Sequence, residues 1–360
     1  MKTIMFYINQ VYDGGSERVI VNLANHFAEI GYQSILVTSF KHTDEYPISD
    51  DVIRVITDDD NHRSRIGRMI RRITVLRKCC KQYKPDILIA FLLESIVRAI
   101  IATAFLPVKT IISVRNDPEL DHSGFVRHFI GKVIYPCSDG CVFQTEYAKS
   151  WYPLKLQAKS AVIGNSIDDS FFAAPRNPID GKIITCGRLS AVKNHKMLIK
   201  AITKLKSLHP GITLDIYGDG ECKKELQDYI STKNATDYIS LKGKTDNVSE
   251  ILSHAEIFAL SSDSEGLPNA LMEAMAAGVP CVSTDCPCGG PALLIDNGNN
   301  GMLVEVGDSN EMAEAISELM NDKPKATQMG ENARDRVKDY SREKIHSLWV
   351  DYVEQIAVGE

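Results

Sequence analysis

The chain has 360 residues, a formal net charge of −6 at pH 7, 44% hydrophobic residues and 24% charged residues. Its length exceeds one ordinary hydrophobic core, so we expect two domains, and its composition excludes a disordered or fibrous protein. The nine cysteines form no regular framework, which excludes a disulfide-stabilised scaffold and indicates a reducing compartment. The apolar run near the start is too short for a signal peptide, so we expect a cytoplasmic protein.

Short apolar runs alternate with helical patterns along the chain, which predicts parallel sheets covered by helices. A polar stretch with two prolines, residues 169–181, divides these runs into two series and is expected to be a linker. The sequence therefore predicts an α/β protein with two doubly wound parallel-sheet domains, residues 1–169 and 181–339. The expected strands are residues 4–8, 34–38, 52–56, 87–91, 110–114, 141–143 and 161–163, followed by 183–186, 213–217, 238–241, 257–260 and 279–283.

Two glycines, Gly14 and Gly15, follow the first predicted strand and open the first predicted helix. Glycine lacks a β-carbon, so the backbone here could approach a phosphate or another ligand closely. The turn is not the dinucleotide-binding fingerprint, because the pattern G-x-G-x-x-G is absent. Alone, such a turn is weak evidence for a site.

Residues 63–84 carry nine basic residues and no acidic one, although the chain as a whole is acidic. Apolar residues recur among them at three- and four-residue steps, which predicts one basic amphipathic helix. Most charge runs are solvated surface faces, but the single sign and the apolar stripe favour contact with an anionic membrane surface or a lipid diphosphate. Nucleic acid is not expected, because no aromatic interleaving or known binding module accompanies the run. The arginines that we associate with this contact are Arg68, Arg71, Arg72 and Arg77.

The first strand of the second series is followed by Gly187, Arg188 and, five residues later, Lys193. Arg188 presents a fork of donors and Lys193 a compact charge, a combination that suits a diphosphate. Gly187 would let a ligand approach the backbone closely. The structural alternative is a helix start with two solvated cations.

Two glutamates eight positions apart, Glu265 and Glu273, flank the entry to a helix predicted over residues 267–277. The main-chain N–H groups at such an entry favour anions or hydroxyl-rich ligands. Each carboxylate can accept two hydroxyl donors, so two separated glutamates could hold a ribose diol and a hexose. The structural alternative is a capped helix with two solvated acids. The entry consists of Gly266, Leu267, Pro268 and Asn269.

Four segments of the chain resemble, in order, the motifs of the family 4 retaining glycosyltransferases, and together they span nearly its whole length. They are Asp13-Gly14-Gly15-Ser16-Glu17-Arg18, Cys186-Gly187-Arg188-Leu189 with Lys193-Asn194, Tyr217-Gly218-Asp219-Gly220-Glu221, and the Glu265-x7-Glu273 pair. The resemblance implies the GT-B fold, in which two Rossmann-like domains face an interdomain cleft. It also implies that a C-terminal helix, about residues 340–360, packs back on the N-terminal domain.

The resemblance assigns roles to the motif residues. By it, Arg188 and Lys193 clamp the donor diphosphate, while Glu273 holds the nucleotide ribose. Glu265 holds the donor sugar and could stabilise developing oxocarbenium charge. The turn at residues 14–15 lies against the transferred sugar and the diphosphate.

Further donor contacts follow from the same resemblance. The main-chain N–H groups of residues 266–269 bind hydroxyls or phosphate, and the turn that contains Lys244 contacts the base, although a plain surface turn is nearly as good an interpretation.

The segment after the strand predicted over residues 110–114 departs from the family pattern, because many members carry a histidine near Arg115. Arg115 and Asn116 could bind the acceptor phosphate or brace the transferred sugar. A salt bridge from Arg115 to Asp117 or Glu119 is an equally good structural alternative.

The resemblance implies a retaining, metal-independent transferase without a cofactor. Such an enzyme would move a hexose or N-acetylhexosamine from a nucleotide sugar, with UDP expected, to a polyprenyl-diphosphate-linked saccharide or a similar glycan. A metal-using transferase would involve the Asp-Asp-Asp run at residues 58–60, which lies far from the motifs named above. We expect a peripheral protein on the inner face of the cell membrane. A sugar-nucleotide epimerase or a phosphorylase could use the same fold, and a catalytically silent partner subunit could bind a nucleotide sugar without turnover.

Overall fold

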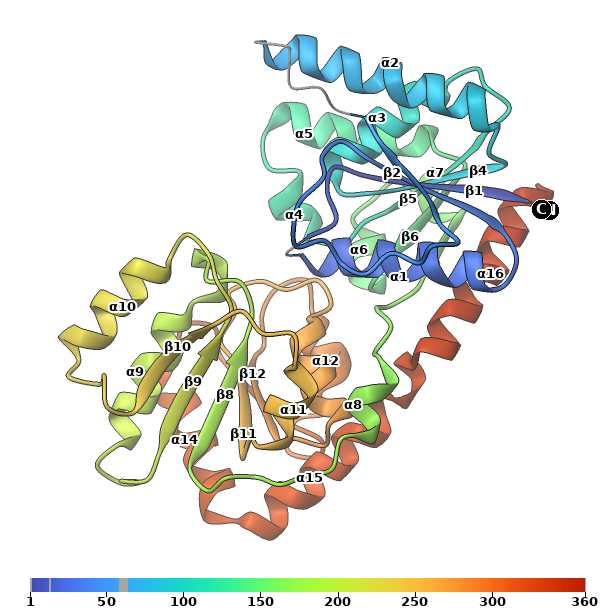
Figure 1. Ribbon diagram of the computed structural model, residues 1–360. Helices are drawn as coiled ribbons and strands as arrows, with labels where there is room; N and C mark the ends of the chain where they lie inside the picture. The colour runs from blue at the N-terminus through green and yellow to red at the C-terminus, as the bar shows by residue number, and fades with distance from the viewer. Residues whose placement is uncertain (1, 13, 58–63, 360) are drawn as a thin grey trace. The chain divides into compact units, whose positions relative to one another are not determined.

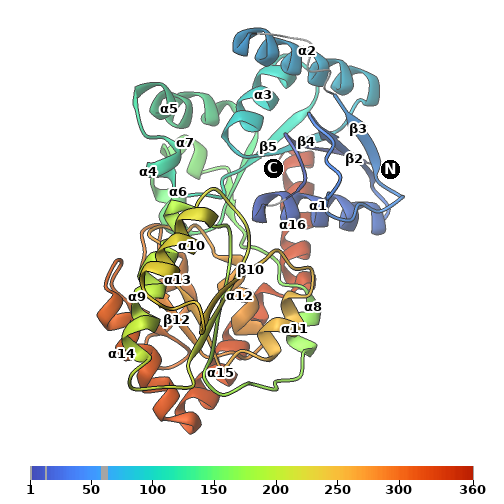
Figure 2. The same cartoon turned by 60° about the vertical axis from the view of Figure 1, so that its left-hand side comes forward.

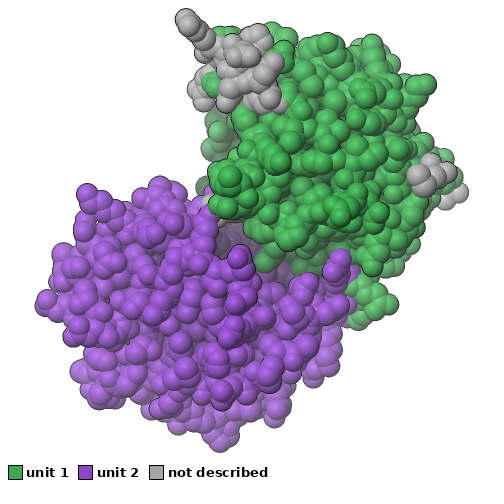
Figure 3. Space-filling view, in the orientation of Figure 1, with its two compact units in different colours: residues 1–166, 343–360 green, residues 167–342 purple. Residues whose placement is uncertain are grey.

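The computed structural model describes residues 2–12, 14–57 and 64–359 of the chain. The chain divides into two compact units (Figure 3), unit 1 with residues 1–166 and 343–360 and unit 2 with residues 167–342. Part of the stretch predicted as a linker forms a short helix, α8 (Asp169–Ala173), whose Phe171 is buried in the core of unit 2. This part of the stretch therefore belongs to unit 2.

Unit 1 is built on a seven-stranded sheet in which every neighbouring pair is parallel. Its strands are β1 (Thr3–Ile8), β2 (Gln33–Thr38), β3 (Ile53–Ile56), β4 (Ile87–Phe91), β5 (Lys109–Ser113), β6 (Gly140–Phe143) and β7 (Ser160–Val162). Their order is β3-β2-β1-β4-β5-β6-β7, so the progression across the sheet reverses between β1 and β4. β1 and β4 are buried at every position, because helices cover both faces of the sheet centre.

The helical segments of unit 1 lie on both faces of this sheet (Figures 1 and 2). They are α1 (Gly15–Glu29), α2 (Arg65–Tyr83), α3 (Leu93–Thr103), α4 (Pro118–Asp121), α5 (Phe125–Phe129), the π-helical turn η1 (Ile130–Ile134), η2 (Tyr135–Cys137), α6 (Glu146–Ser150), α7 (Leu154–Gln157) and α16 (Arg342–Val358). In both views α1 and α16 lie on one face and α2 and α3 on the other. Right-handed connections between parallel strands require this placement of α1, α2 and α3. Because η1 contacts α3, it lies on the α3 face.

Unit 2 repeats the same plan with six strands in the order β10-β9-β8-β11-β12-β13, again all parallel. Its strands are β8 (Lys182–Cys186), β9 (Thr213–Tyr217), β10 (Ile239–Gly243), β11 (Ile257–Leu260), β12 (Cys281–Thr284) and β13 (Met302–Val304). Its helical segments, besides α8, are η3 (Ala191–Lys193), α9 (His195–Leu205), α10 (Lys223–Thr232), α11 (Val248–Ser253), α12 (Asn269–Ala276), α13 (Gly290–Leu294), α14 (Ser309–Asn321), α15 (Lys323–Arg336) and η4 (Val337–Tyr340). The two sheets confirm the predicted fold class of two doubly wound α/β domains.

The helix that carries Glu273 is shorter than predicted. The sequence predicted residues 267–277, whereas α12 begins at Asn269 because Pro268 has an extended backbone (φ −75°, ψ 107°) and is the N-cap. The Leu267 side chain is buried in the apolar core of unit 2 instead of extending the helix. At the other end Gly278 adopts φ +70°, a left-handed conformation that suits glycine after a helix.

The Tyr-Gly-Asp-Gly-Glu turn is explained by backbone packing within unit 2. The N–H of Gly187 donates to the carbonyl of Tyr217 over 2.9 Å, which joins the loop after β8 to the end of β9. A β-carbon at Gly218 would collide with the carbonyl of Gly187, and Gly218 also adopts φ +137°. The glycine therefore permits the close approach of two loops.

The C-terminal helix α16 is part of the core of unit 1. Trp349 is fully buried and stacks on Phe91, the last residue of β4, with ring centroids 6.0 Å apart. The Tyr352 hydroxyl accepts a hydrogen bond from the N–H of Cys141 over 2.8 Å and donates one to the carbonyl of Lys159 over 2.6 Å. One side chain of α16 thus satisfies backbone groups at the start of β6 and just before β7.

The Tyr352→Phe variant should lower the free energy of unfolding by about 1 kcal/mol, because the N–H of Cys141 and the carbonyl of Lys159 lose their short bonds to the hydroxyl and keep only a 3.4 Å contact with each other. Urea denaturation measures this. Asp351→Asn, at an exposed position of the same helix, is the matched control and should change stability by less than about 0.5 kcal/mol. Equal stability of the two variants would contradict the anchoring role.

Candidate functional site

The predicted donor-site residues of unit 2 follow two neighbouring strands at the sheet centre. Arg188 and Lys193 follow β8, and Glu265 follows β11, which pairs with β8. The progression across the sheet reverses between these two strands. In open parallel sheets, ligands bind beyond the carboxyl ends of strands at such a reversal. The topology therefore brings these three residues to the edge of unit 2 where a ligand is expected.

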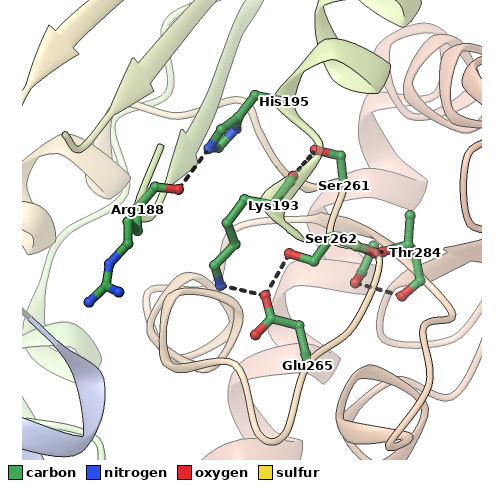
Figure 4. A network of polar contacts seen from close by, with 8 residues as sticks. Arg188, Lys193, His195, Ser261, Ser262, Glu265 and Thr284 are labelled. Carbon is green, nitrogen blue, oxygen red and sulfur yellow. Dashed lines mark hydrogen bonds and ion pairs between the residues drawn. The ribbon is translucent and has the colours of Figure 1, made fainter. Parts of the chain in front are cut away.

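An ion pair joins the two loops (Figure 4). The Lys193 ammonium Nζ lies 2.5 Å from Oε1 of Glu265, and the Ser262 hydroxyl donates to the same oxygen over 2.5 Å. The side chains of Lys193 and Glu265 are 22% and 11% exposed, so the pair is largely shielded from water while it remains reachable. The carboxylate is thus held by two donors from two different loops.

Three hydrogen bonds fix the backbone around this ion pair. Asn194 Nδ2 donates to Oδ1 of Asp263 over 2.7 Å, and the N–H of Asp263 donates to the carbonyl of Val192 over 2.8 Å. The Ser261 hydroxyl donates to the carbonyl of Lys193 over 3.0 Å. Because the two loops are cross-linked on either side of Lys193, the distance between the lysine and the glutamate is set by the fold.

The loop that carries Glu265 is also bound to the next strand. The Thr284 hydroxyl, at the end of β12, donates to the carbonyl of Ser262 over 2.6 Å, and Ser262 itself is buried. Ser261, Ser262 and Thr284 were not predicted from the sequence. For the two serines, the only signal in the sequence is their position directly after an apolar strand. Thr284 carried no such signal.

In Figure 4 the side chains of Arg188 and Lys193 extend in the same direction from neighbouring segments of the backbone. Arg188 is exposed, in contrast to Lys193. The ring of His195, a residue that was also not predicted from the sequence, lies with Nε2 3.4 Å from the carbonyl of Arg188. Burial lowers the pKa of His195 to about 4, so this histidine is neutral near pH 7 and its Nε2–H can donate to that carbonyl.

Glu273 lies inside α12 and is buried. Burial raises the pKa of the Cys186 thiol, and the nearby carboxylate of Glu273 raises it further. Glu273 is therefore close to the carboxyl end of β8, the strand that precedes Arg188. The structure thus places both glutamates of the pair at the same edge of unit 2 as the two cations.

The helix entry between the two glutamates is tightly packed. Leu267 and Pro268 are buried, while Gly266 and Asn269 are partly exposed. A β-carbon at Gly290 would collide with the carbonyl of Gly266, so the first turn of α13 lies directly against this entry. A ligand could therefore meet the main chain of this segment or the partly exposed side chain of Asn269.

Lys244 lies in unit 2 after an edge strand of the sheet. It is exposed and follows β10, the strand at the edge of the sheet and two strands from β8. Its charge acts on Asp219, whose pKa is lowered mainly by the N–H of Gly220 and by Lys223, with Lys244 a minor cause. A base contact by this turn stays a prediction.

In unit 1, the predicted glycine turn begins α1, with Gly14 as the N-cap. The carboxylate of Glu17 folds back toward this turn, since a β-carbon on Gly14 would collide with it. Glu17 is buried, and its negative charge lies at the positive end of α1. The N-terminus predicted to approach a phosphate thus carries its own anion, while Asp13 lies outside the described residues.

Arg115 is held inside unit 1. Its guanidinium donates to the side-chain oxygen of Asn165 over 2.8 Å and lies 4.5 Å from the ring centre of Phe91 and 5.6 Å from that of Trp349. Burial lowers the pKa of Arg115 to about 9. These surroundings favour an internal role, and acceptor binding by Arg115 stays a prediction.

Asn116 is exposed, and its amide nitrogen lies 3.2 Å from a carboxylate oxygen of Asp121. This contact within the same loop gives no sign of a ligand role, so acceptor binding by Asn116 also stays a prediction.

The predicted basic helix forms as α2, although Arg63 lies outside the described residues. Its last turns are packed on unit 1 through Leu76, Cys79 and Cys80, which are buried. Its first turns expose Ile66, Met69 and Ile70, at 73%, 43% and 59%. The apolar stripe is therefore buried at one end of the helix and open to solvent at the other.

Three of the four arginines that we associated with a membrane differ in their surroundings. Arg68 is exposed, and Arg72 is partly buried over the ring of Phe40 at 4.7 Å. Arg77 donates to the carbonyls of Ala102 and Ala104, both over 2.8 Å. Arg77 therefore holds the end of α3, which corrects its assignment to the membrane-facing set.

The described part of the chain contains neither a metal-binding group nor a membrane span. Within residues 2–12, 14–57 and 64–359, no three His, Cys, Asp or Glu side chains form a group that could hold a metal ion. The Asp-Asp-Asp run at residues 58–60 lies outside these ranges, so metal independence stays a prediction. No helix among the described residues combines the length and apolar character needed to cross a bilayer.

Comparison with known families assigns each half of the chain. The family model described as Glycosyltransferase Family 4 matches residues 13–171, and the model described as Glycosyl transferases group 1 matches residues 166–336. The two matches correspond closely to unit 1 and unit 2 and together extend over most of the chain.

Two curated relatives are similar to the chain over nearly its full length. A GalNAc-alpha-(1->4)-GalNAc-alpha-(1->3)-diNAcBac-PP-undecaprenol alpha-1,4-N-acetyl-D-galactosaminyltransferase of Campylobacter jejuni is 27% identical over 367 residues, which cover 99% of each chain. An uncharacterized glycosyltransferase of Haemophilus influenzae is 26% identical over 354 residues, with 97% of this chain and 99% of the relative covered.

Solved structures share the fold. Sucrose-phosphate synthase from Thermosynechococcus elongatus superimposes with a TM-score of 0.85 at 16% identity, with 100% of both chains covered. HepE from Anabaena in complex with UDP-glucose gives a TM-score of 0.82 at 16% identity, with 99% of this chain and 100% of that chain covered.

The buried neutral state of His195 predicts a pH dependence of stability. Because its pKa falls from 6.5 in the unfolded chain to about 4 in the fold, the unfolded state binds more protons below pH 6.5 and stability falls as the pH falls. Between pH 7 and pH 5 the wild type should lose about 2 kcal/mol more than His195→Gln, which keeps a donor but cannot titrate. Urea midpoints at both pH values measure this difference, and equal losses would show that His195 is not buried in its neutral form.

Proposed function

We propose that the chain transfers a sugar from a UDP sugar to a lipid-linked saccharide with retention of configuration. Both halves of the chain match glycosyltransferase models, and each half is built on a doubly wound sheet. The chain therefore belongs to the family 4 type glycosyltransferases with the GT-B fold. The transferred sugar is a hexose or an N-acetylhexosamine. The observation that carries the proposal is the Lys193–Glu265 ion pair at the carboxyl ends of β8 and β11, with Arg188 beside it.

The donor diphosphate binds at Arg188 and Lys193 in this proposal. Negative charge grows on the diphosphate as the sugar bond breaks, and cations that strengthen their contact at that moment lower the barrier. Arg188 is exposed and supplies a planar fork of donors, whereas Lys193 is mostly buried and supplies a fixed positive charge. A diphosphate that reaches Lys193 shares the ammonium with Glu265, which frees part of the carboxylate for sugar hydroxyls.

The glutamates take separate parts of the donor. Glu265 binds the sugar and faces the carbon at which positive charge develops, because it lies at the lysine that holds the phosphate. Glu273 binds the ribose from within α12, near the carboxyl end of β8. The main-chain N–H groups of Gly266, Leu267 and Asn269 supplement these contacts, since the side chains of Leu267 and Pro268 are buried and Pro268 has no N–H.

Retention and metal independence complete the proposed mechanism. The incoming hydroxyl attacks on the face that the diphosphate leaves, and a leaving phosphate oxygen accepts its proton. Arg188 and Lys193 provide the positive charge that a metal ion would otherwise supply. No cofactor takes part.

The acceptor is a saccharide linked to a polyprenyl diphosphate. Support comes from the Campylobacter relative, whose name specifies an undecaprenyl-diphosphate acceptor and an N-acetylgalactosamine donor group. The helix α2 supplies a second argument, because it combines a run of basic residues with exposed apolar side chains in its first turns. This combination suits an anionic lipid surface, on which the enzyme is peripheral.

The overall activity is tested by incubating the enzyme with labelled UDP sugars and a panel of lipid-diphosphate saccharides, with and without a chelator. Transfer that survives the chelator, together with a product whose anomeric configuration by NMR matches the donor, is the expected result. Inversion at C2 of the UDP sugar would indicate an epimerase instead. Binding of the donor without turnover would indicate a silent partner subunit.

Arg188→Ala should lower turnover about 100- to 1000-fold, because a charge-stabilising group of this kind contributes about 3–4 kcal/mol to the transition state. Steady-state kinetics with a lipid-linked acceptor measure the loss, and a thermal unfolding curve shows whether the fold is kept. Lys200→Ala, which removes an exposed cation from α9, is the matched control and should keep wild-type turnover. Comparable rates for the two variants would remove Arg188 from the proposed mechanism.

The combined variant Arg68→Gln, Arg71→Gln and Arg72→Gln should weaken binding to anionic vesicles by about two orders of magnitude, at about 1 kcal/mol for each cation near the surface. Vesicle sedimentation at low salt measures this, since high salt screens the attraction. Arg77 is kept because it supports α3. The control removes three exposed lysines of unit 2, with Lys223→Gln, Lys224→Gln and Lys233→Gln, and it should bind like the wild type. Loss of binding in both triple variants would show that only net charge matters.

A further inference from the structure

A second solvent-exposed apolar segment lies in unit 1, in the stretch formed by α5 and η1. Phe125 is 89% exposed, Val126 70%, Phe129 49% and Val133 47%. Phe125, Phe129 and Val133 recur every four residues, so they form one stripe along the helical segment. Two phenylalanines and two valines on one short stretch form an apolar patch of the kind that marks an interaction site.

The stripe is exposed because the opposite side of the segment is fixed to unit 1. The Nδ1–H of His122 donates to the carbonyl of Arg127 over 2.8 Å, and the His122 ring stacks on Trp151 with centroids 5.1 Å apart. The Lys132 ammonium lies 3.6 Å from the centre of the Trp151 ring. A β-carbon at Gly131 would come within 2.9 Å of the same ring. The segment is therefore held against an aromatic base and presents its apolar stripe outward.

The segment itself carries charge of one sign, whereas α4 before it carries Glu119 and Asp121. Residues 122–138 include Arg127 and Lys132 and no acidic residue, as is the case for residues 63–84 in the basic helix. Arg127 is exposed beside the phenylalanines. The exposed Arg127 beside the stripe complements an anionic lipid surface.

The segment shares a location with the exposed end of α2. Both lie on the α3 face of the sheet of unit 1, since α3 contacts α2 and η1 alike. α2 follows β3 and α5 follows β5, so the exposed first turns of α2 and the start of α5 both lie toward the carboxyl edge of this sheet. A flat surface that meets one of them can meet the other.

We infer that the α5–η1 segment is a second membrane-contacting element, in which Phe125, Val126 and Phe129 insert among the lipids of an anionic bilayer. The inference rests on the proposed function and adds to it, because α2 supplies positive charge and the new segment supplies apolar side chains that enter the bilayer. Aromatic side chains suit the boundary between headgroups and acyl chains. Together the two elements fix which face of unit 1 meets the membrane that holds the lipid-linked acceptor.

The first test is the double variant Phe125→Ser and Phe129→Ser, with vesicles of phosphatidylglycerol and phosphatidylcholine. Its affinity should fall at least about tenfold, and the loss should persist at high salt because it concerns apolar burial. The matched control is Phe105→Ser. Phe105 is fully exposed in the same unit but lies between α3 and β5, at the opposite edge of the sheet. It should bind as the wild type does.

The second test measures insertion directly. Phe125→Trp should be quenched by brominated phospholipids, and Phe105→Trp should not be quenched beyond the wild-type background from Trp151 and Trp349. Wild-type binding that is unchanged by the double serine variant, or equal quenching at both positions, would overturn the inference and leave contact through α2 standing. A wild type that does not bind these vesicles would also overturn it. The transfer assay with a detergent-solubilised acceptor then judges the proposed function separately.

Discussion

One ion pair, between Lys193 and Glu265, organises the edge of unit 2 where the motif residues meet. It is not a flexible surface contact, because hydrogen bonds on either side of Lys193 join its loop to the loop that carries Glu265. An ammonium and a carboxylate held in this way have a fixed separation before any ligand arrives. In the proposed function, little conformational entropy is therefore lost when the donor binds, because the ammonium for the phosphate and the carboxylate for the sugar already have fixed positions.

Two glycines of unit 2, one in a motif and one in α13, serve the same end by close backbone packing. Gly218 lets the loop after β9 lie on the backbone of the loop after β8, and Gly290 lets α13 lie on the entry of α12. By contrast, a β-carbon at Gly187 would meet only the flexible end of the Lys193 side chain, at 3.7 Å. The rigidity that the ion pair requires is thus produced by backbone contacts that other residues would prevent.

Regular periodicity made the fold predictable, and long-range contacts made part of the site unpredictable. Apolar runs identified twelve of the strands, but β13 has three residues in a polar, glycine-rich stretch and gave no signal. The cations and glutamates were found because their residue types and spacing carry chemistry. Ser262 and His195 were missed because their residue types and spacing do not distinguish them from ordinary buried positions, although their partners Glu265 and Arg188 lie close to them in the sequence. The enclosure of Arg115 could not be predicted for a different reason, because its partner Trp349 lies near the other end of the chain.

Arg115 also shows why the C-terminal helix is not an appendage. Burying a guanidinium without a carboxylate is costly, and unit 1 offsets that cost with one amide oxygen and the faces of two aromatic rings. One of those rings, Trp349, comes from α16, which is separated from the rest of unit 1 by the whole of unit 2. The chain therefore leaves unit 1 after residue 166 and must return at residue 343 before this charge is enclosed. Folding of the first unit to its final state thus depends on the last residues of the sequence, so its core is completed only when the entire chain has been made.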